Sequence, residues 1–356
     1  MDRILIIAEY PEHNQREGMR QRILSIDKEF EGKKRTYLSL AKFGNIKATR
    51  KIIEEGAIEY FQLNILLHYN KIKRIIAEFD YIYIHSVENF TNALLFNLRN
   101  KNVTWDVHGV VPEEFEFMGS RLKYLYYGWC EKKLAKIVTN IIVVSNEMKQ
   151  YYLEKYPLLA EKKIYLKPIY STNVFRGTDK EALEKLRSDL RIKEDDTVFI
   201  YSGNVQKWQN VEQTIKICSE IARDNYFFIF LTGALNEVKD MIMKVPNNKM
   251  RYLVTSVKPS ELCEYYEISN YGFILRDEHL LNRVAAPTKL VEYLYYGLTP
   301  IVKSERVGDA LSLGYEYIKS NKIPEYLRAI KSEKNRQVAN IMATVNLNVK
   351  LTDIID

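Results

Sequence analysis

A single glutamate stands inside an otherwise apolar helical stretch, NRVAAPTKLVEYLYYGLTPIV, in residues 282–302. Pro287 suits the first turn of a helix, where its missing N–H would have had no partner. The N–H groups of Thr288 and Lys289 then point out of the helix start, which together with the helix dipole favours a phosphate. One turn deeper, the oxygens of Glu292 could accept hydrogen bonds from the two hydroxyls of a ribose. The alternative is an ion pair between Glu292 and a lysine on a solvated face.

A histidine and a lysine in two predicted loops could also do chemistry. His108 ends the strand-like stretch VTWDVHG, and Gly109 beside it would permit close approach of a ligand. Lys207 follows Gly203 in the predicted loop YSGNVQKW. Their structural alternatives are a satisfied, partly buried histidine, a solvated lysine and a glycine that serves a tight turn. Three acidic residues also have structural interpretations, the last two as the start of a helix: Asp106, Glu113 and Glu114.

Short apolar strands alternate with helical segments throughout the chain, which predicts βαβ units and a parallel sheet. The predicted strands of the first half are RILIIAEY, IEYFQL, YIYIHS, VTWDVHG and NIIVVSN. The pattern restarts with TVFIYSG, YFFIFLTG, RYLVTSV, YGFIL and TPIVK. Ligands of such open sheets bind at the C-terminal ends of the strands, and the candidate residues follow those ends.

The chain of 356 residues exceeds one ordinary core, so two domains are expected. Periodicity lapses at residues 165–179, where Pro, Ser, Thr and Gly gather. We place the boundary near residue 172, with a first α/β domain at 1–171 and a second at 172–340. The tail, 341–356, begins as a helix and could pack back on the first domain.

The composition predicts a globular protein that meets an anionic partner. Hydrophobic residues make up 46% and charged residues 28% of the chain, which excludes long disorder. The net charge of +7 favours a nucleotide, a nucleic acid or a membrane surface, but no nucleic-acid-binding motif is found. Three scattered cysteines without a CxxC pair argue against disulfides and zinc. No signal peptide or membrane span is expected, so we predict a cytoplasmic protein.

Residues 120–138 combine aromatic and basic side chains on one predicted helix. The aromatic residues are Tyr124, Tyr126, Tyr127 and Trp129, and the basic ones are Arg121, Lys123, Lys132, Lys133 and Lys136. This combination is typical of a membrane interface. The alternative is an internal helix with a lysine-rich outer face.

Four segments resemble, in order, those of GT-B glycosyltransferases, and of glycosyltransferase family 4 in particular. TWDVHGVVPEE (104–114) resembles a first-domain loop with a histidine, and NIIVVSNEMKQYY (140–152) resembles the strand and helix after it. FIYSGNVQKWQN (199–210) resembles the loop that opens the second domain. APTKLVEYLYYGLTPIV (286–302) resembles the donor-binding segment. The resemblance implies two Rossmann-like domains that face each other across a cleft.

The resemblance also implies a donor site. Glu292 would bind the ribose. The amides of Thr288 and Lys289 would bind the diphosphate, and the backbone of Val257 would bind the base. The implied donor-binding residues are Gly18, Gly203, Asn204, Lys207, Val257, Arg276, Thr288, Lys289 and Glu292. The implied catalytic residues are His108, which would reach the transferred sugar, and Glu292.

The sequence departs from the family pattern at two positions. Val284 stands where many members carry a second glutamate that touches the donor sugar, and Asp277 or Glu278 is the candidate replacement. Asn204 stands where an arginine is common. Gly18 belongs to the loop expected beneath the diphosphate, and Arg276 could add charge there.

The implied reaction moves a sugar from a nucleotide diphosphate sugar of UDP or GDP type to a hydroxyl of a glycan or lipid-linked glycan. The resemblance implies retention, no metal or other cofactor, and a place in bacterial surface polysaccharide synthesis, with possible contact to the inner face of the cytoplasmic membrane. No Asp-x-Asp pair stands in a donor loop, so a helix start and basic side chains would stabilise the diphosphate.

A GT-B epimerase or hydrolase and a non-catalytic nucleotide-sugar-binding protein stay open as alternatives. An epimerase or hydrolase would need two poised carboxylates, and no clear pair is found. Val284 makes a binding protein conceivable.

Overall fold

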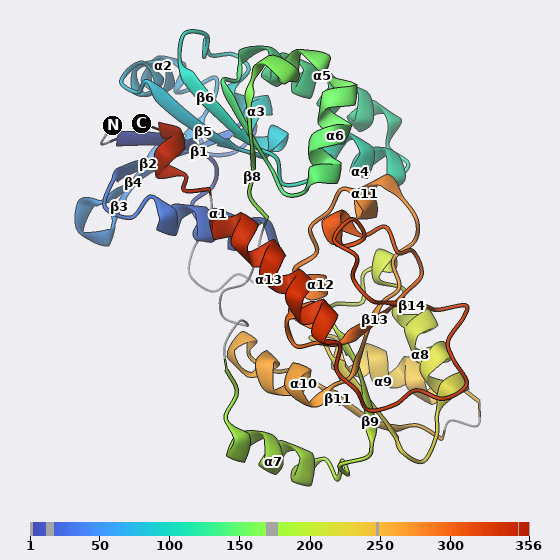
Figure 1. The fold of residues 1–356 in the computed structure, drawn as a ribbon. Helices are drawn as coiled ribbons and strands as arrows, with labels where there is room; N and C mark the ends of the chain where they lie inside the picture. Colours follow the sequence, from blue (N-terminus) through green and yellow to red (C-terminus); the bar gives the residue numbers. More distant parts are fainter. Residues whose placement is uncertain (1–2, 12–17, 169–176, 247–248, 348, 356) are drawn as a thin grey trace. The chain divides into compact units, whose positions relative to one another are not determined.

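The computed structural model describes residues 3–11, 18–168, 177–246, 249–347 and 349–355. The chain divides into two compact units, one of residues 1–168 with 345–356 and one of residues 169–344 (Figure 1). The sequence had suggested a boundary near residue 172 and a tail from residue 341. Each unit is an α/β domain built on its own sheet, as expected.

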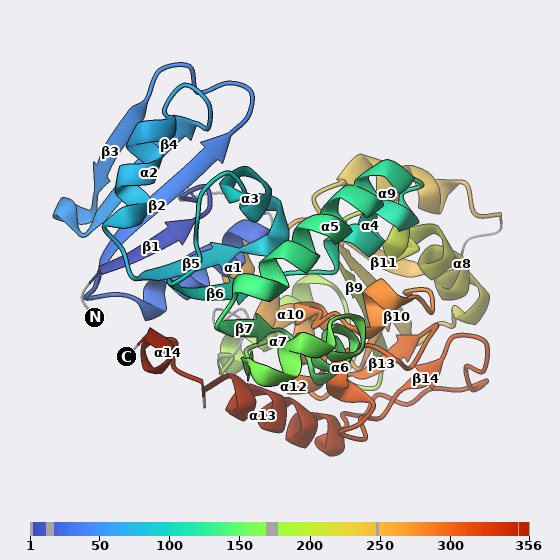
Figure 2. The same cartoon turned by 90° about the horizontal axis from the view of Figure 1, so that it is seen from above.

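The first unit has an eight-stranded sheet in the order β3-β4-β2-β1-β5-β6-β7-β8, whose course from β3 to β7 is visible in Figure 2. Its strands are β1 Arg3–Ile7, β2 Lys34–Ala41, β3 Thr49–Ile53, β4 Ile58–Asn64, β5 Tyr81–His85, β6 Asn102–Asp106, β7 Asn140–Val143 and β8 Lys163–Leu166. The pairs are parallel except β3 with β4. The sequence missed β2, β3 and β8. β3 is mostly exposed and contains one arginine and one lysine, and β8 is only four residues long, so neither shows a clear apolar run.

The helices of the first unit follow most of these strands. They are α1 Gly18–Glu29, α2 Tyr69–Ala77, α3 Ser86–Ala93, α4 Val111–Phe117, α5 Arg121–Ile137, α6 Asn146–Lys155 and α14 Thr352–Ile355. Helix α2 begins only at Tyr69, because Asn64 caps a turn before it. Its Oδ1 accepts from the amides of Leu66 and Leu67 at 3.0 and 3.1 Å.

The second unit has a six-stranded parallel sheet in the order β11-β10-β9-β12-β13-β14. Its strands are β9 Thr197–Ser202, β10 Tyr226–Leu231, β11 Arg251–Thr255, β12 Tyr271–Ile274, β13 Thr299–Val302 and β14 Ile318–Lys319. Its helices are α7 Lys180–Asp189, α8 Val211–Ile221, α9 Leu235–Met243, α10 Leu262–Ile268, α11 Leu280–Arg283, α12 Thr288–Tyr295 and α13 Glu333–Leu347. The continuous apolar runs of β9 and β10 are fully buried, as expected of strands covered on both faces.

In each sheet the strand order reverses direction at one place, which is where open α/β sheets bind ligands. In the first sheet this switch point lies between β1 and β5, and in the second between β9 and β12. His85 ends β5, while Gly203 and Arg276 follow β9 and β12. Residues with functional potential therefore lie at the switch point of each unit.

The end of the chain belongs to the first unit and lies beside its N-terminal strand (Figures 1 and 2). Lys167 Nζ donates to the carbonyl of Val349 at 2.7 Å and pairs with Glu29 at 2.7 Å. Leu351 and Ile354 join the core around β1. These contacts, rather than an extension of the second sheet, hold the last residues.

Candidate functional site

The helix α12 carries the glutamate that the sequence singled out, and its inner face explains why the helix forms here. Leu290, Val291 and Leu294 are buried in the core of the second unit. Pro287 precedes the first turn with φ −70° and ψ 116°, and Gly297 follows the last turn with φ +68°. The predicted start and stop of the helix match the structure.

Glu292 is buried and held by a relay of hydroxyl groups. Its Oε2 accepts from Tyr266 Oη at 3.0 Å, and Tyr266 Oη lies 2.7 Å from Ser202 Oγ. Burial raises the pKa of Glu292, and the hydrogen bond from Tyr266 and the charge of Lys289 oppose that shift. The carboxylate does not form the surface ion pair that was its alternative interpretation, because only 7% of the residue is exposed.

The side chain of Lys289 lies directly beneath Gly203. Its Nζ lies 4.6 Å from the centre of the Tyr201 ring and 3.2 Å from Gln209 Oε1. A Cβ atom at Gly203 would lie 2.6 Å from this nitrogen, and the φ of +149° is one that other residues rarely adopt. Glycine therefore leaves the room that the amine occupies.

Two cations share this place, and the described residues offer neither of them an ion pair with a carboxylate. They are Lys289 and Arg276. Burial, and then the charge of Arg276, lower the pKa of Lys289 to about 7, while the charge of Glu292 opposes this. Burial also lowers the pKa of Arg276. An anion bound here would relieve both unfavourable burials at once.

Of the other predicted donor residues, Asn204, Val257 and Thr288 belong to the second unit. Asn204 is exposed, and its Nδ2 donates to Gln206 Oε1 at 2.8 Å. Val257 follows β11 and packs on the core, and Thr288 is the first residue of α12. The side chain of Lys207 and the loop before Gly18 lie outside the described residues. Gly18 itself begins α1 in the first unit.

The position of the missing second glutamate is filled by core packing. Val284 is 1% exposed. Asp277, one candidate replacement, pairs with Lys303 and accepts from Asn210 Nδ2 at 3.2 Å. The hydrogen bond from Lys303 lowers the pKa of Asp277. Glu278, the other candidate, is exposed.

In the first unit His108 belongs to a buried polar cluster. Its Nε2 lies 3.2 Å from Asp106 Oδ2 and 2.9 Å from His85 Nδ1. Arg22, from α1, donates to both oxygens of Asp106, with the shortest contact at 2.6 Å. Burial would raise the pKa of Asp106, but the charges of Arg22 and His108 outweigh it and hold the pKa well below its usual range.

The geometry fixes which nitrogen of His108 remains for a ligand. Nε2 faces Asp106 and His85, while Nδ1 is buried and no residue that the structure describes forms a hydrogen bond with it. Burial, the largest cause, lowers the pKa of His85 to about 4, so this second histidine is neutral. Arg22 and His85 were not predicted from the sequence as members of this cluster. The signal for His85 was its place at the end of a strand, which matches that of His108.

Comparison of the sequence and the structure with known proteins identifies the class of enzyme. Residues 36–168 match the family model described as Glycosyltransferase Family 4. Together with the structural matches, this confirms the predicted GT-B fold and the enzyme class, a glycosyltransferase.

Solved structures match this glycosyltransferase over nearly its whole length. Sucrose-phosphate synthase from Thermosynechococcus elongatus is 11% identical with a TM-score of 0.65, covering 98% of this chain and 97% of its own. A glycosyltransferase from Rickettsia africae is 14% identical with a TM-score of 0.64, covering 99% and 95%. HepE from Anabaena, in complex with UDP and glucose, is 13% identical with a TM-score of 0.62, covering 99% and 91%. No sequence of a curated protein matches the chain.

The cluster of the glycosyltransferase's first unit also has the spacing of a metal site, but one of its members is already engaged. His85, Asp106 and His108 place one ligand atom each within 4.8 Å of one another. Both oxygens of Asp106 already accept from the guanidinium of Arg22. A divalent ion would meet that fixed positive charge, so the set suits the orientation of His108 better than metal binding.

Glu113 and Glu114 start α4, as the sequence indicated, but neither is a simple surface charge. Glu113 is buried and pairs with Lys155 at 2.6 Å. Burial, and then the charge of Glu88, raise the pKa of Glu114 to about 7. A Cβ atom at Gly109 would clash with Glu114 Oε1, so the glycine leaves room for this carboxyl.

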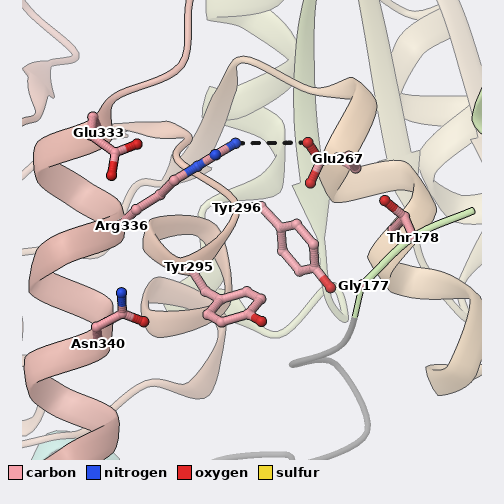
Figure 3. A pocket seen from close by; sticks show the side chains of 8 residues that line it. All are labelled: Gly177, Thr178, Glu267, Tyr295, Tyr296, Glu333, Arg336 and Asn340. Carbon is pink, nitrogen blue, oxygen red and sulfur yellow. Dashed lines mark ion pairs between the residues drawn. The ribbon is translucent and has the colours of Figure 1, made fainter. Parts of the chain in front are cut away.

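A pocket of about 400 Å³ opens at the other end of α12 (Figure 3). Tyr295 and Tyr296 line it together with Arg336, which pairs with Glu267 at 3.7 Å. Along α12, Lys289 and Tyr295 are six residues apart, a rise of about 9 Å. The pocket is therefore separate from the place where the two unpaired cations lie.

Proposed function

We propose that this glycosyltransferase moves a sugar from a nucleotide diphosphate sugar, of UDP or GDP type, to a hydroxyl group of a glycan or lipid-linked glycan. The observation that carries the proposal is the pair of cations Lys289, which lies beneath Gly203, and Arg276, whose charge acts on Lys289, together with the buried carboxylate of Glu292. Two partly buried cations suit a diphosphate, and the buried carboxylate suits the hydroxyls of a ribose. HepE, which shares the fold, was solved with UDP-glucose, and this supports a nucleotide sugar as donor.

The second unit would bind the donor by charge and by position. The diphosphate gains negative charge as the bond from the anomeric carbon to its oxygen breaks. Fixed positive groups stabilise that charge where it develops, without a metal ion. Lys289, Arg276 and the amides of the first turn of α12 would supply them, and the side chain of Lys207 could add to them.

The first unit would contribute His108 to the sugar. Its Nδ1 could accept a hydrogen bond from a sugar hydroxyl while Asp106 and His85 hold the ring from the other nitrogen. The new bond joins the anomeric carbon to the acceptor oxygen, whose proton passes to an oxygen of the departing diphosphate or to solvent. We propose retention of anomeric configuration, as the family resemblance implies. A role in bacterial surface polysaccharide synthesis at the cytoplasmic face of the membrane belongs to the same proposal.

A nucleotide-sugar panel tests the proposal. The protein is incubated with UDP- and GDP-sugars, with and without hydroxyl acceptors, in buffer containing EDTA. We expect release of nucleoside diphosphate and a glycosylated product only when both substrates are present. Hydrolysis or epimerisation without an acceptor would overturn transfer as the activity, and the lack of any binding to the nucleotides would overturn the donor site.

A further inference from the structure

The helix α5 turns an apolar stripe towards solvent. Leu122, Leu125, Tyr126 and Trp129 are 84%, 56%, 37% and 51% exposed. Their spacing of i, i+3, i+4 and i+7 places them on one face of the helix. The buried face carries other residues, among them Cys130 and Leu134. An internal helix with a merely lysine-rich outer face, which was the alternative interpretation, does not have this pattern.

Two loops extend this surface. The loop after β2 exposes Phe43 by 93% and Ile46 by 76%, and the turn after β4 exposes Leu66 by 70% and Leu67 by 63%. We call the eight apolar residues of α5 and the two loops the apolar surface. Such a number of large exposed apolar side chains in one region marks an interaction site rather than ordinary surface.

Hydrogen bonds join the three segments. Asn64 Nδ2 donates to the carbonyls of Lys42 and Gly44, while its Oδ1 accepts from the amide of Leu66 at 3.0 Å. Lys42 Nζ in turn donates to Tyr126 Oη at 2.6 Å and lies 5.0 Å from the centre of its ring. The two loops and α5 therefore form one continuous surface within the first unit.

The charges that accompany the apolar surface are positive. On α5 the exposed charged residues are Arg121, Lys123, Lys132, Lys133 and Lys136, and the one acidic residue of the helix, Glu131, is 0% exposed and pairs with Lys155. Residues 42–53 contain four basic residues and no acidic one. Exposed aromatic and aliphatic side chains with lysines at their border complement an anionic lipid bilayer. A surface that binds a protein partner would more often carry both positive and negative charges.

We propose that the apolar surface docks the protein on an anionic membrane, with Trp129, Leu122 and Phe43 entering the interface between lipid headgroups and chains. The loops follow the C-terminal ends of β2 and β4, the same sheet edge at which His108 follows β6. Docking would therefore bring a lipid-linked acceptor near this histidine. That last step rests on the proposed function, whereas the docking itself does not.

Vesicle co-sedimentation tests the docking without any assay of transfer. The full chain is mixed with vesicles of phosphatidylcholine containing about 30% phosphatidylglycerol, and with phosphatidylcholine alone. We expect binding to the anionic vesicles that weakens as salt rises from about 50 to about 500 mM. The variant Leu122→Ser/Trp129→Ser should bind at least about tenfold more weakly. Lys132→Glu/Lys133→Glu should lose the preference for anionic lipid.

Matched controls separate docking from damage to the fold. Met243→Ser and Ile330→Ser remove apolar side chains of the second unit that are 71% and 58% exposed, and should bind vesicles like the parent. Melting temperature is measured for each variant. Equal vesicle binding by the parent and by Leu122→Ser/Trp129→Ser would overturn the proposal. It would also be overturned if the parent binds no vesicles but forms a dimer in light scattering that this variant disrupts. Vesicle binding with no transfer in the panel would keep the docking and reject the activity.

Discussion

Lys289 Nζ fills the space that any side chain at Gly203 would need, because a Cβ atom there would lie 2.6 Å away. The two residues come from different elements, the loop after β9 and the first turn of α12. The pair lies at the switch point of the second sheet. The position of the cation therefore depends on a glycine that lies 86 positions earlier in the chain.

Gly203→Ala should weaken binding of a nucleoside diphosphate. The methyl group would push the amine aside, and the backbone would keep a φ of +149° that alanine rarely adopts. We expect about tenfold or greater loss of affinity for UDP or GDP, measured by calorimetry, if one charge-assisted contact is lost. Gly233→Ala is the matched control, since its Cβ would meet no atom within 4 Å. Equal affinities of both variants would show that Lys289 does not contact the ligand.

Donor binding should take up a proton above neutral pH. Lys289 has a pKa lowered to about 7, so the amine of the ligand-free protein is mostly neutral at pH 8. A bound diphosphate favours the charged form, so affinity for a nucleotide sugar should fall as pH rises from about 7 to 9, by at most about tenfold per unit. Calorimetry in buffers of different ionisation enthalpy measures the proton directly.

Two variants identify the titrating group. Arginine stays charged throughout this range, so Lys289→Arg should remove the pH dependence if the larger side chain fits. Lys331 is a second buried amine with a pKa lowered to about 7, and it donates to the carbonyls of Tyr266 and Tyr296. Lys331→Met should keep the pH dependence. Loss of it in Lys331→Met alone would assign the proton to Lys331 instead.

Glu292→Ala should raise the donor KM while the fold survives. Loss of a charge-assisted hydrogen bond of about 1.5–3 kcal/mol would weaken donor binding about ten- to a hundredfold. Tyr266→Phe removes the hydroxyl that occupies Oε2 of Glu292 but leaves the carboxylate in place. It should therefore affect donor binding less than Glu292→Ala. Unchanged donor affinity of Glu292→Ala would remove this residue from the site.

The sequence predicts residues that lie near one another in the chain better than those brought together by the fold. Pro287, the helical spacing and Gly297 were enough to place Glu292 on α12. No local pattern could show that Arg22 meets Asp106, 84 positions away, or that His85 meets His108 from a neighbouring strand. These contacts depend on the order of the strands.

The same reason explains why the sequence assigned Lys289 through its backbone amide rather than its side chain. A helix start predicts free amides from local geometry alone. The side chain reaches the loop after β9 only because β9 and β12 are neighbours and α12 packs beside them. The apolar stripe of α5 could have been read from its period, but which face is buried depends on the helices and strands around it.

Asp106→Ala and His108→Ala should differ in stability although the two residues touch. Removing Asp106 leaves the buried guanidinium of Arg22 without its carboxylate, which costs about 3–5 kcal/mol. Removing His108 leaves Asp106 paired with Arg22, so the melting temperature should stay close to that of the parent. Thermal unfolding of the two variants, with the parent beside them, checks this contrast.

His108→Ala should lower kcat far more than it weakens donor binding. The nucleotide contacts that we propose lie in the second unit, whereas Nδ1 of His108 would meet the sugar as it is transferred. General acid–base or orienting groups of this kind contribute about a hundredfold or more to rate. His108→Gln, whose side chain can still hydrogen-bond, is the matched variant and should recover part of the rate. A stable His108→Ala with the parent's kcat would exclude the residue from catalysis, and a lowered melting temperature with normal turnover of the folded fraction would make it structural.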